Sequence, residues 1–440
     1  MNTKKAFSTI FVVLVALFLL AGCGSNGDSA SKNDGASSDS DDSTVINFMH
    51  QWTEGSSAKQ NKLVNDIISA FEKENPGVKV EQEVLSAEQY KDKLKVLAAS
   101  NELPDVGQAW PGGWLKPYAE GNKFASFDDI LDDEFRNKFA GGTLESFEVE
   151  GKTYGLPEEI NITGIFYNKA IFEENGVEVP TTLAELKNVA TVLKDNGVTP
   201  IALGNKDRWT GSIWYMYLAD RIAGPDTIEN AVNRTGTFED PGLIEAAAQI
   251  QELVGQGAFI KGTNGMTNLE AENMFMNGLT AMYLTASWSL PNFTTNEDTP
   301  QEFKDNVGYF KFPTVEGGKG DIDSFVGGTA GVFVAEKSEV KEEAKQFAKF
   351  FVEKLAESSL QDAGIIPAMK LDTESLDLPP LVSQMLGDLA NASDITLFAD
   401  NIMTAQPAQV HLDMIQSLFG GNVTPEEFVE AHEEALSNNE

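Results

Sequence analysis

The chain of 440 residues carries a formal net charge of −36 at pH 7 and contains one cysteine. The charge argues against nucleic acid as a partner, because phosphate binding requires clustered Lys and Arg side chains. A single cysteine excludes internal disulfides and thiolate metal clusters. A chain of this length buries an adequate core without them and is long enough for two domains or lobes. We expect no cofactor and no metal.

Residues 1–22 predict a secretory signal peptide. Lys4 and Lys5 precede an apolar run over residues 6–21, and this run is shorter than the roughly 20 apolar residues of a membrane-spanning helix. The sequence Leu20-Ala21-Gly22-Cys23 resembles the lipobox of bacterial lipoproteins. The resemblance implies cleavage before Cys23 and a diacylglycerol on its thiol. We therefore expect a lipid anchor on the extracellular face of the cell membrane.

Residues 24–43 are almost entirely Ser, Asp, Gly and Asn. Such a segment cannot bury enough apolar surface to offset the entropy lost on ordering. Together with the lipidated cysteine, residues 23–43 are therefore expected to form a disordered tether. A tether of this length suits a Gram-positive surface. The ordered part is expected to begin near Thr44.

Strands and helices alternate in the first part of the ordered chain. The predicted strands cover residues 45–49, 78–81 and 104–108, and the predicted helices cover residues 63–71 and 88–100. The helices show apolar residues at helical spacing, and Asn75-Pro76-Gly77 ends the first one. Alternation of this kind predicts βαβ units and a parallel sheet.

A second α/β region follows. Its expected strands and extended segments are residues 162–167, 199–203, 279–285, 307–312 and 331–335, and its expected helices are residues 182–196, 212–222, 243–254 and 340–355. The remainder, up to Leu436, is expected to be helical with loops. We therefore predict an α/β fold of two lobes, each a mainly parallel sheet flanked by helices.

Four of the six tryptophans follow predicted strands, namely Trp52, Trp110, Trp209 and Trp288. Ligands of parallel α/β sheets bind outside the carboxyl ends of the strands, so these rings are expected to gather at one cleft. An indole face is large and flat, and it can stack on the C–H face of a pyranose ring. A single tryptophan is as often ordinary packing, but four at strand ends favour a carbohydrate site. Trp114 and Trp214 are assigned to the core.

Polar side chains stand beside these tryptophans. Gln51 and Gln108 precede Trp52 and Trp110, while Glu159 and Asn161 flank the strand at residues 162–167. Their amide and carboxylate groups have fixed donor and acceptor directions that suit sugar hydroxyls. Each of these residues, taken alone, is also compatible with a solvated loop. Because they occur together beside the tryptophans, we expect them to contact a ligand. Further polar residues at these places are His50, Glu158, Lys206, Asp207 and Arg208.

Six short segments occur in a characteristic order and spacing: Leu103–Val106, Tyr154–Pro157, Phe166–Lys169, Ala281–Tyr283 ahead of Trp288, Phe325–Thr329 and Ile366–Ala368. Together they resemble the family 1 extracellular solute-binding proteins, the carbohydrate group that includes maltose-binding protein. The resemblance covers nearly the whole chain from Thr44 onward.

The resemblance implies a two-lobed periplasmic-binding-protein-like fold of type II, with the ligand in the interlobe cleft. Crossings near Leu156, near Phe312 and over residues 355–364 would place residues 44–155 and about 313–355 in one lobe. Residues 156–312 and about 356–440 would form the other. The implied function is capture of a mono- or oligosaccharide by a monomer, which delivers it to the permease subunits of an ABC importer.

The family's sugar contacts, carried over position by position, fall on Trp52, Trp110, Asn161 and Trp288, and the Phe325–Thr329 pattern adds Gly328. Glucose-binding relatives often place an aspartate directly before the last tryptophan, where this chain has Ser287. That departure puts a glucose-type ligand in doubt and favours no other sugar.

The main alternative is a secreted carbohydrate-active hydrolase or lyase. Glycoside hydrolysis needs two carboxylates roughly 5–10 Å apart, whereas Glu158 and Glu159 on a strand would point to opposite faces. A metal-ion-binding lipoprotein is disfavoured because His50, His411 and His432 show no metal-ligand spacing, and the tryptophans disfavour a peptide binder. We therefore expect a binding protein rather than an enzyme.

Overall fold

The computed structural model describes residues 43–373 and 375–438. The predicted signal peptide, Cys23 and the tether up to residue 42 lie outside the described residues. Within the described ranges, no helix is both long enough and apolar enough to cross a membrane.

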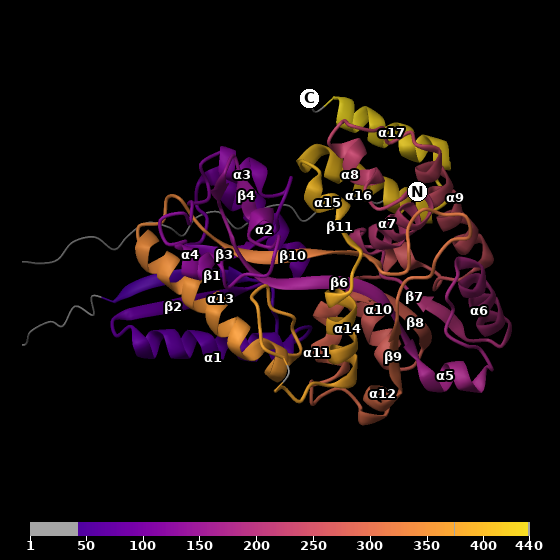
Figure 1. Cartoon of the computed structure of the whole chain (residues 1–440), viewed down its shortest axis with the longest axis horizontal. Coiled ribbons are helices and arrows are strands. Elements are labelled where there is room, and N and C mark those ends of the chain that lie inside the picture. The colour runs from indigo at the N-terminus through magenta and orange to yellow at the C-terminus, as the bar shows by residue number, and fades with distance from the viewer. Residues whose placement is uncertain (1–42, 374, 439–440) are drawn as a thin grey trace, which may run out of the picture. The chain divides into compact units, whose positions relative to one another are not determined.

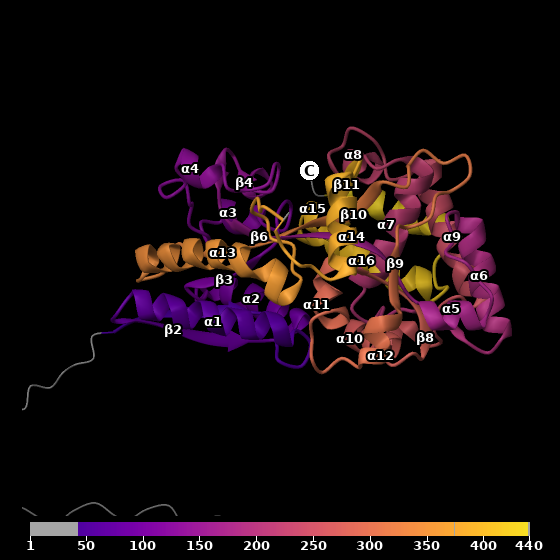
Figure 2. The same cartoon turned by 60° about the horizontal axis from the view of Figure 1, so that its bottom comes forward.

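The first predicted βαβ region is confirmed. Strands β1 (Thr44–His50), β2 (Val78–Val84) and β3 (Val106–Ala109) pair in parallel in the order β2-β1-β3, with α1 (Ala58–Glu74) and α2 (Ala87–Ser100) between them in sequence. The apolar face of α1 packs against α13 (Lys341–Ala363), and Figures 1 and 2 show the two helices side by side. We call the part built around β1–β3, α1 and α13 the first lobe.

Small elements between β3 and the long strand β6 were not predicted. They are α3 (Lys116–Glu120), α4 (Asp133–Arg136), the 3-10 turn Glu145–Phe147, β4 (Glu148–Val149) and β5 (Lys152–Thr153). Each is too short to show the apolar periodicity from which longer elements can be read.

The second lobe holds the rest of the sheet and most of the helices. Its strands are β7 (Thr199–Ala202), β8 (Thr280–Ala286), β9 (Val307–Phe310) and β11 (Asp394–Leu397), together with the end of β6 (Leu156–Asn168) and the start of β10 (Ser324–Val334). Its helices are α5 (Lys169–Glu174), α6 (Leu183–Asp195), α7 (Trp209–Ala223), α8 (Thr227–Val232), α9 (Pro241–Gln256), α10 (Asn268–Met276), α11 (Leu290–Phe293), α12 (Gln301–Asn306), α14 (Pro380–Ala390), α15 (Ala399–Ile402), α16 (Ala405–Phe419) and α17 (Pro425–Ser437).

The sheet is a mixed one, with the path β2-β1-β3-β10-β6-β8-β7 and with β9 and β11 paired to β6 and β10. The predicted α/β architecture is present, but the expectation of mainly parallel pairing holds only for β1–β3. In the second lobe β7 and β8 are parallel, whereas β6 runs antiparallel to β8, β9 and β10. The reason is that β6 and β10 are long strands that pass between the lobes in opposite directions.

The segment after residue 363 is mainly helix and loop, as predicted, but it also contains β11, which pairs in parallel with β10. Its sequence Asp394-Ile395-Thr396-Leu397 is too short for a periodic signal. Pairing with β10 supplies the hydrogen bonds that make it a strand.

Three chain segments join the lobes. Strand β6 begins with Leu156 in the core of the first lobe and reaches Ile165 in the core of the second. Strand β10 makes the return passage, from Val326 to Val332, and Figure 1 shows both strands spanning the molecule between α13 and α7. The third segment follows the end of α13. It also pairs with β6, since Ile160 N donates to the Ile366 carbonyl over 2.9 Å.

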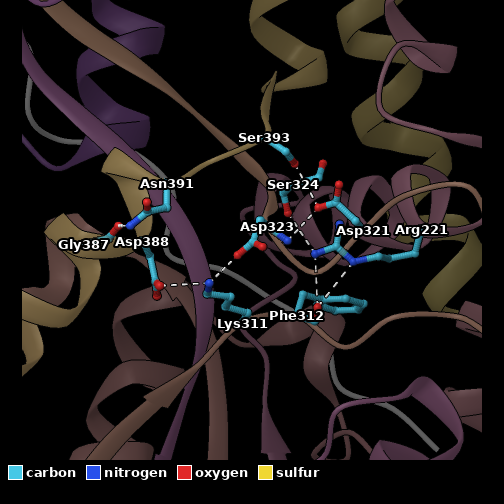
Figure 3. A network of polar contacts seen from close by, with 10 residues as sticks. All are labelled: Arg221, Lys311, Phe312, Asp321, Asp323, Ser324, Gly387, Asp388, Asn391 and Ser393. Atoms are coloured by element: carbon cyan, nitrogen blue, oxygen red, sulfur yellow. Dashed lines mark hydrogen bonds and ion pairs between the residues drawn. The ribbon is translucent and has the colours of Figure 1, made fainter.

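The crossing that the sequence placed near Phe312 lies instead within β10. Phe312 is fully buried in the second lobe, where it stacks on Tyr217 with ring centroids 4.5 Å apart. Arg221 Nη2 donates to the carbonyls of Phe312 and Ser324 over 3.1 and 2.9 Å, and these contacts are drawn in Figure 3. The segment between them is therefore fixed to the second lobe, and the chain leaves only after it.

The same network ties β9 and the start of β10 to α14. Lys311 Nζ pairs with Asp323 at 2.5 Å and with Asp388 at 3.0 Å (Figure 3). These contacts hold the start of β10, which lines part of the cavity described next.

Candidate functional site

A cavity of about 500 Å³ lies where strand ends of both lobes meet. This volume is within the usual range of small-molecule sites. Eight of the nine residues predicted to contact a ligand line it: Gln51, Trp52, Trp110, Glu159, Asn161, Trp209, Trp288 and Gly328. The cavity gives the position of these residues. Ligand contact by each of their side chains remains a prediction.

The strand-end rule explains why the tryptophans meet. Strands β1 and β3 are parallel, so Trp52 and Trp110 leave the sheet at the same edge. Strands β7 and β8 are also parallel, so Trp209 and Trp288 leave it together in the second lobe. Of the other two tryptophans, Trp214 is 1 % exposed in the core, as predicted.

The wall of the second lobe is a run of touching rings. Trp209 and Trp288 meet edge to face with centroids 5.6 Å apart, and Phe398 lies 6.0 Å beyond Trp288. Arg208 adopts a left-handed φ of 65° just before Trp209 and is held by an ion pair of 2.6 Å to Asp413. Such a backbone conformation is unfavourable for arginine, so the ion pair helps to fix the entry to α7.

The wall of the first lobe is built differently. Trp52 is only 6 % exposed, because its ring packs on Phe351 and His50 at centroid distances of 5.9 and 5.3 Å. Trp110 is half-buried and has the Lys91 ammonium 5.2 Å from its ring centroid. Trp110 is therefore the more available of the two rings.

Trp114 does not line the cavity. It is half-buried and meets Trp110 edge to face at 5.1 Å, so it supports that ring from behind. Its prediction as a packing residue agrees with this position.

Gln108 is the one predicted ligand contact that the structure places elsewhere. It is 1 % exposed and does not line the cavity. Its Nε2 donates to Glu158 over 2.9 Å, and its Oε1 accepts from the backbone N–H of Gln51 over 2.8 Å. The reason is that strand alternation turns this side chain into the protein, where it positions the loop that carries Gln51 and Trp52.

The side chains of the adjacent Glu158 and Glu159 on β6 lie on opposite faces of the strand, as strand alternation requires. Glu158 is buried behind the wall, and burial, together with repulsion from Glu159, raises its pKa well above the usual range. Glu159 lines the cavity, and burial raises its pKa while Asn161 Nδ2 donates to it over 2.8 Å. Ser287 in turn donates to Asn161 Oδ1 over 2.9 Å. Ser287 thus acts on the site through Asn161.

Gly328 makes room for an aromatic ring. A Cβ at this position would lie 3.2 Å from Phe398 Cδ2, closer than ordinary van der Waals contact. The absence of a side chain at this position of β10 therefore lets Phe398 pack close to the strand and complete the aromatic wall.

Carboxylates outnumber cations around the cavity. Glu88, Glu159, Asp207, Glu272 and Asp400 line it, against Lys91 and Lys206. Burial raises the pKa of Glu272 to about 7 and raises the pKa of Asp207 and Asp400 above their ordinary values. Carboxylate oxygens accept hydrogen bonds, so this arrangement suits a neutral ligand rich in hydroxyl donors and disfavours an anion.

The lobes touch around the cavity. On one side Gln60 Nε2 donates to the Trp288 carbonyl over 3.3 Å, and Asn292 Nδ2 donates to the Ser56 carbonyl over 3.1 Å. Elsewhere Trp114 N donates to the Asn401 carbonyl over 3.0 Å. The structure therefore shows a closed arrangement, in which a ligand would be enclosed.

Sequence reasoning missed several lining residues, including Phe398, Asp400, Asn401, Asn268 and Glu272. The run Ile395-Thr396-Leu397-Phe398 is β-branched and aromatic, which is a weak strand signal followed by an aromatic residue at the strand end. That signal could have found Phe398. Glu272, inside α10, carries no comparable signal.

Comparisons with known proteins agree with this geometry. Residues 54–354 match the family model of bacterial extracellular solute-binding proteins. The multiple sugar-binding protein of Streptococcus mutans is 26% identical over 359 residues, which cover 80% of this chain and 79% of that protein.

Two solved structures resemble the fold closely. One, from work on xylan utilization by Caldanaerobius polysaccharolyticus, has a TM-score of 0.84 and 32% identity and covers 89% of this chain and 99% of its own. The other is a chitin oligosaccharide binding protein with a TM-score of 0.83 and 27% identity, covering 90% of this chain and 99% of its own.

Proposed function

Because the chain belongs to the family of bacterial extracellular solute-binding proteins, we propose that it encloses a saccharide between its lobes and delivers it to an ABC importer. The observation that carries the proposal is the cavity itself, which has indole rings on both walls and an excess of carboxylates around them. Aromatic faces pack on the C–H surfaces of a sugar ring, while carboxylates and amides accept and donate at its hydroxyls.

Oligosaccharides of plant or chitinous origin are the first ligands to test. The two solved structures named above concern xylan and chitin oligosaccharides, and the multiple sugar-binding relative supports a saccharide in general. The buried Ser287, bonded to Asn161, takes the place of the aspartate common in glucose-binding relatives. This substitution supports a ligand other than a glucose-type sugar.

Binding without chemistry fits the carboxylates better than hydrolysis does. Glu158 is turned away from the cavity against Gln108, and Glu159 is held by Asn161. The adjacent pair therefore does not flank a bond in the cavity, as a glycosidase requires. The hydrolase alternative has no specific observation in its favour.

The location of the protein follows from its proposed partner. A solute-binding protein must stay near its permease, and lipidation at Cys23 with a tether up to residue 43 would hold a monomer at the outer face of the membrane. Stable attachment requires two acyl chains, which a diacylglycerol supplies. Replacing Cys23 by Ala should release the protein from the membrane fraction or leave unprocessed precursor. Unchanged processing and retention would contradict the anchor.

The test of function is a thermal-shift and calorimetric screen with xylotriose, chitotriose, galactobiose and maltotriose. A ligand at a hundredfold excess over its dissociation constant should add about 2.7 kcal/mol of stability. Chromatography after long incubation should recover the saccharide unchanged. Cleaved product that scales with protein concentration and disappears in Glu159→Gln would favour the hydrolase, and the absence of binding by any saccharide would contradict the proposal.

A further inference from the structure

Two buried histidines connect the cavity wall to helices at the far side of the second lobe. Ser212, in the first turn of α7, lines the cavity, and its Oγ lies 2.6 Å from Nε2 of His411 on α16. His411 Nδ1 lies 2.8 Å from Nε2 of His432 on α17. His432 Nδ1 lies 2.7 Å from the carbonyl oxygen of Phe428. Helix α16 packs against both α7 and α17, and Figure 1 shows the three helices together.

The carbonyl at the end of this chain fixes the direction of every hydrogen bond in it. The Phe428 carbonyl can only accept, so the proton of neutral His432 lies on Nδ1 and its Nε2 is bare. That bare nitrogen accepts from His411, whose proton therefore also lies on Nδ1. His411 Nε2 is then bare in its turn and accepts the Ser212 hydroxyl proton.

The surroundings keep both imidazoles neutral. His411 and His432 are 0 % and 2 % exposed, and the Phe238 ring stacks on His432 with centroids 4.3 Å apart. Burial lowers the pKa of His432 to about 4, and burial together with the neighbouring His432 lowers the pKa of His411 well below its ordinary value. The tautomers are therefore set by hydrogen bonding at neutral pH.

We infer that Ser212 is a specificity-determining residue that presents only acceptor lone pairs to the cavity, so that the ligand must place a hydroxyl or N–H donor against it. A carbonyl, carboxylate or ether oxygen at the same place would face an oxygen with no proton to give. The inference rests on the proposed function, because it assigns the polarity of one position in that ligand site.

The same contact does not make Ser212 a nucleophile. An activated serine needs a base that holds its proton as an imidazolium. Here the base is buried beside a second neutral imidazole, and the ring nitrogens of the two histidines are engaged by Ser212, by each other and by the Phe428 carbonyl. The arrangement orients the hydroxyl and leaves its proton in place.

The first test is the tautomeric state of the histidines, measured by long-range ¹H–¹⁵N NMR on the ligand-free protein at pH 6.5. The chain has three histidines, and His50 is an internal control. Its Nδ1 accepts from Trp52 N–H and its Nε2 contacts Gln82 Oε1, so it should show the Nε2–H form. His411 and His432 should both show Nδ1–H. An Nε2–H form or an imidazolium at either position overturns the inference.

The second test uses variants at His432, which does not line the cavity. His432→Phe removes the acceptor for His411 Nδ1–H, so His411 should change to Nε2–H and donate to Ser212. Affinity should then fall about three- to tenfold, the value of one neutral hydrogen bond. His432→Gln keeps an acceptor and should preserve both the His411 tautomer and the affinity.

The probe is the saccharide among xylotriose, chitotriose, galactobiose and maltotriose that gives the largest thermal shift. Unchanged affinity in His432→Phe, with the His411 tautomer changed, overturns the inference. If no saccharide binds, the proposed function fails, and the tautomers still decide whether Ser212 is acceptor-only. If His432→Phe does not fold, the tautomers of His411 and His432 in the unsubstituted protein still test the inference, because an Nε2–H form at either position overturns it.

Discussion

The two walls of the cavity hold their aromatic rings in different ways. In the first lobe Trp52 is packed between His50 and Phe351 and is almost completely buried. In the second lobe Trp209 and Trp288 contact each other and leave part of their surface uncovered.

The charge distribution follows the same division. The second lobe supplies Asp207, Glu272 and Asp400 against the single cation Lys206, whereas in the first lobe Glu88 is matched by Lys91, which lies over Trp110. The second lobe thus offers a ready surface of rings and acceptors, and the first lobe covers it on closure. The comparison teaches that strand ends bring a ring to the cavity, while packing behind the ring decides how much of it a ligand can use.

Removing Trp288 should have the largest effect. Trp288→Ala deletes the central ring of the second-lobe wall, between Trp209 and Phe398. Loss of a buried aromatic anchor should weaken saccharide binding by about 2–4 kcal/mol, measured by calorimetry. The matched control is Phe350→Ala, which removes a half-buried aromatic ring on α13 outside the cavity and should leave affinity per folded molecule unchanged. A variant that unfolds but binds normally per folded molecule would assign Trp288 to the core.

Blocking closure of the two lobes should have the second-largest effect on saccharide affinity. A Cβ on Gly113 would lie 2.4 Å from the Ile402 carbonyl oxygen and 2.5 Å from that of Met403, and these are backbone atoms of the other lobe. Gly113→Ala should therefore disfavour the closed arrangement and weaken binding about tenfold.

Small-angle scattering with ligand should then show a larger radius for Gly113→Ala than for the unsubstituted protein. Gly141→Ala is the control, because a Cβ there meets nothing within 4 Å. Equal radii and equal affinities in the two variants would show that the Gly113 contact does not govern closure.

Glu272 should give the second-lobe wall a pH dependence of moderate size. Its pKa is raised from 4.5 to about 7 by burial, so the folded state binds its proton more tightly than the unfolded state. The resulting stability is complete below about pH 4.5 and is lost as pH rises through about 7, up to about 3 kcal/mol.

Denaturant unfolding of Glu272→Gln between pH 4.5 and 8 should show a smaller decline in stability, because the contribution of Glu272 is removed while those of Glu158 and Glu159 remain. The exposed Glu174→Gln on α5 should retain the full decline. Parallel curves for the two variants would show that Glu272 does not titrate in this range.

Trimming Trp52 should have the smallest effect on binding. Trp52→Phe keeps an aromatic ring against Phe351 but makes the side chain smaller. Affinity should change by less than about threefold, while the melting temperature falls because the smaller ring leaves a space at a position that is 6 % exposed. A loss of affinity as large as that of Trp288→Ala would mean that the two walls contribute equally.

The sequence could predict the location of residues when that location follows from the neighbouring strand or helix in the chain. A tryptophan that directly follows a strand must lie at the sheet edge, and parallel neighbours bring two such edges together. This is why Trp52, Trp110 and Trp288, each within two residues of a strand end, reached the cavity, whereas Trp209 reached it at the start of α7, seven residues after the end of β7. Hydrophobic periodicity likewise located α1 and α13, because their buried faces repeat over several turns.

Only the tertiary structure decided the contacts between segments distant in the chain. Strand alternation turned Gln108 inward onto Glu158, 50 residues away, and pairing with β10 made a strand of residues 394–397, which brought Phe398 to the wall. His411 and His432 looked unrelated in sequence, yet helix packing set their rings 2.8 Å apart at the nitrogens. The physical reason is the same in each case: hydrogen bonds and packing between distant residues depend on how the elements are docked, and docking leaves no periodic signal in the chain.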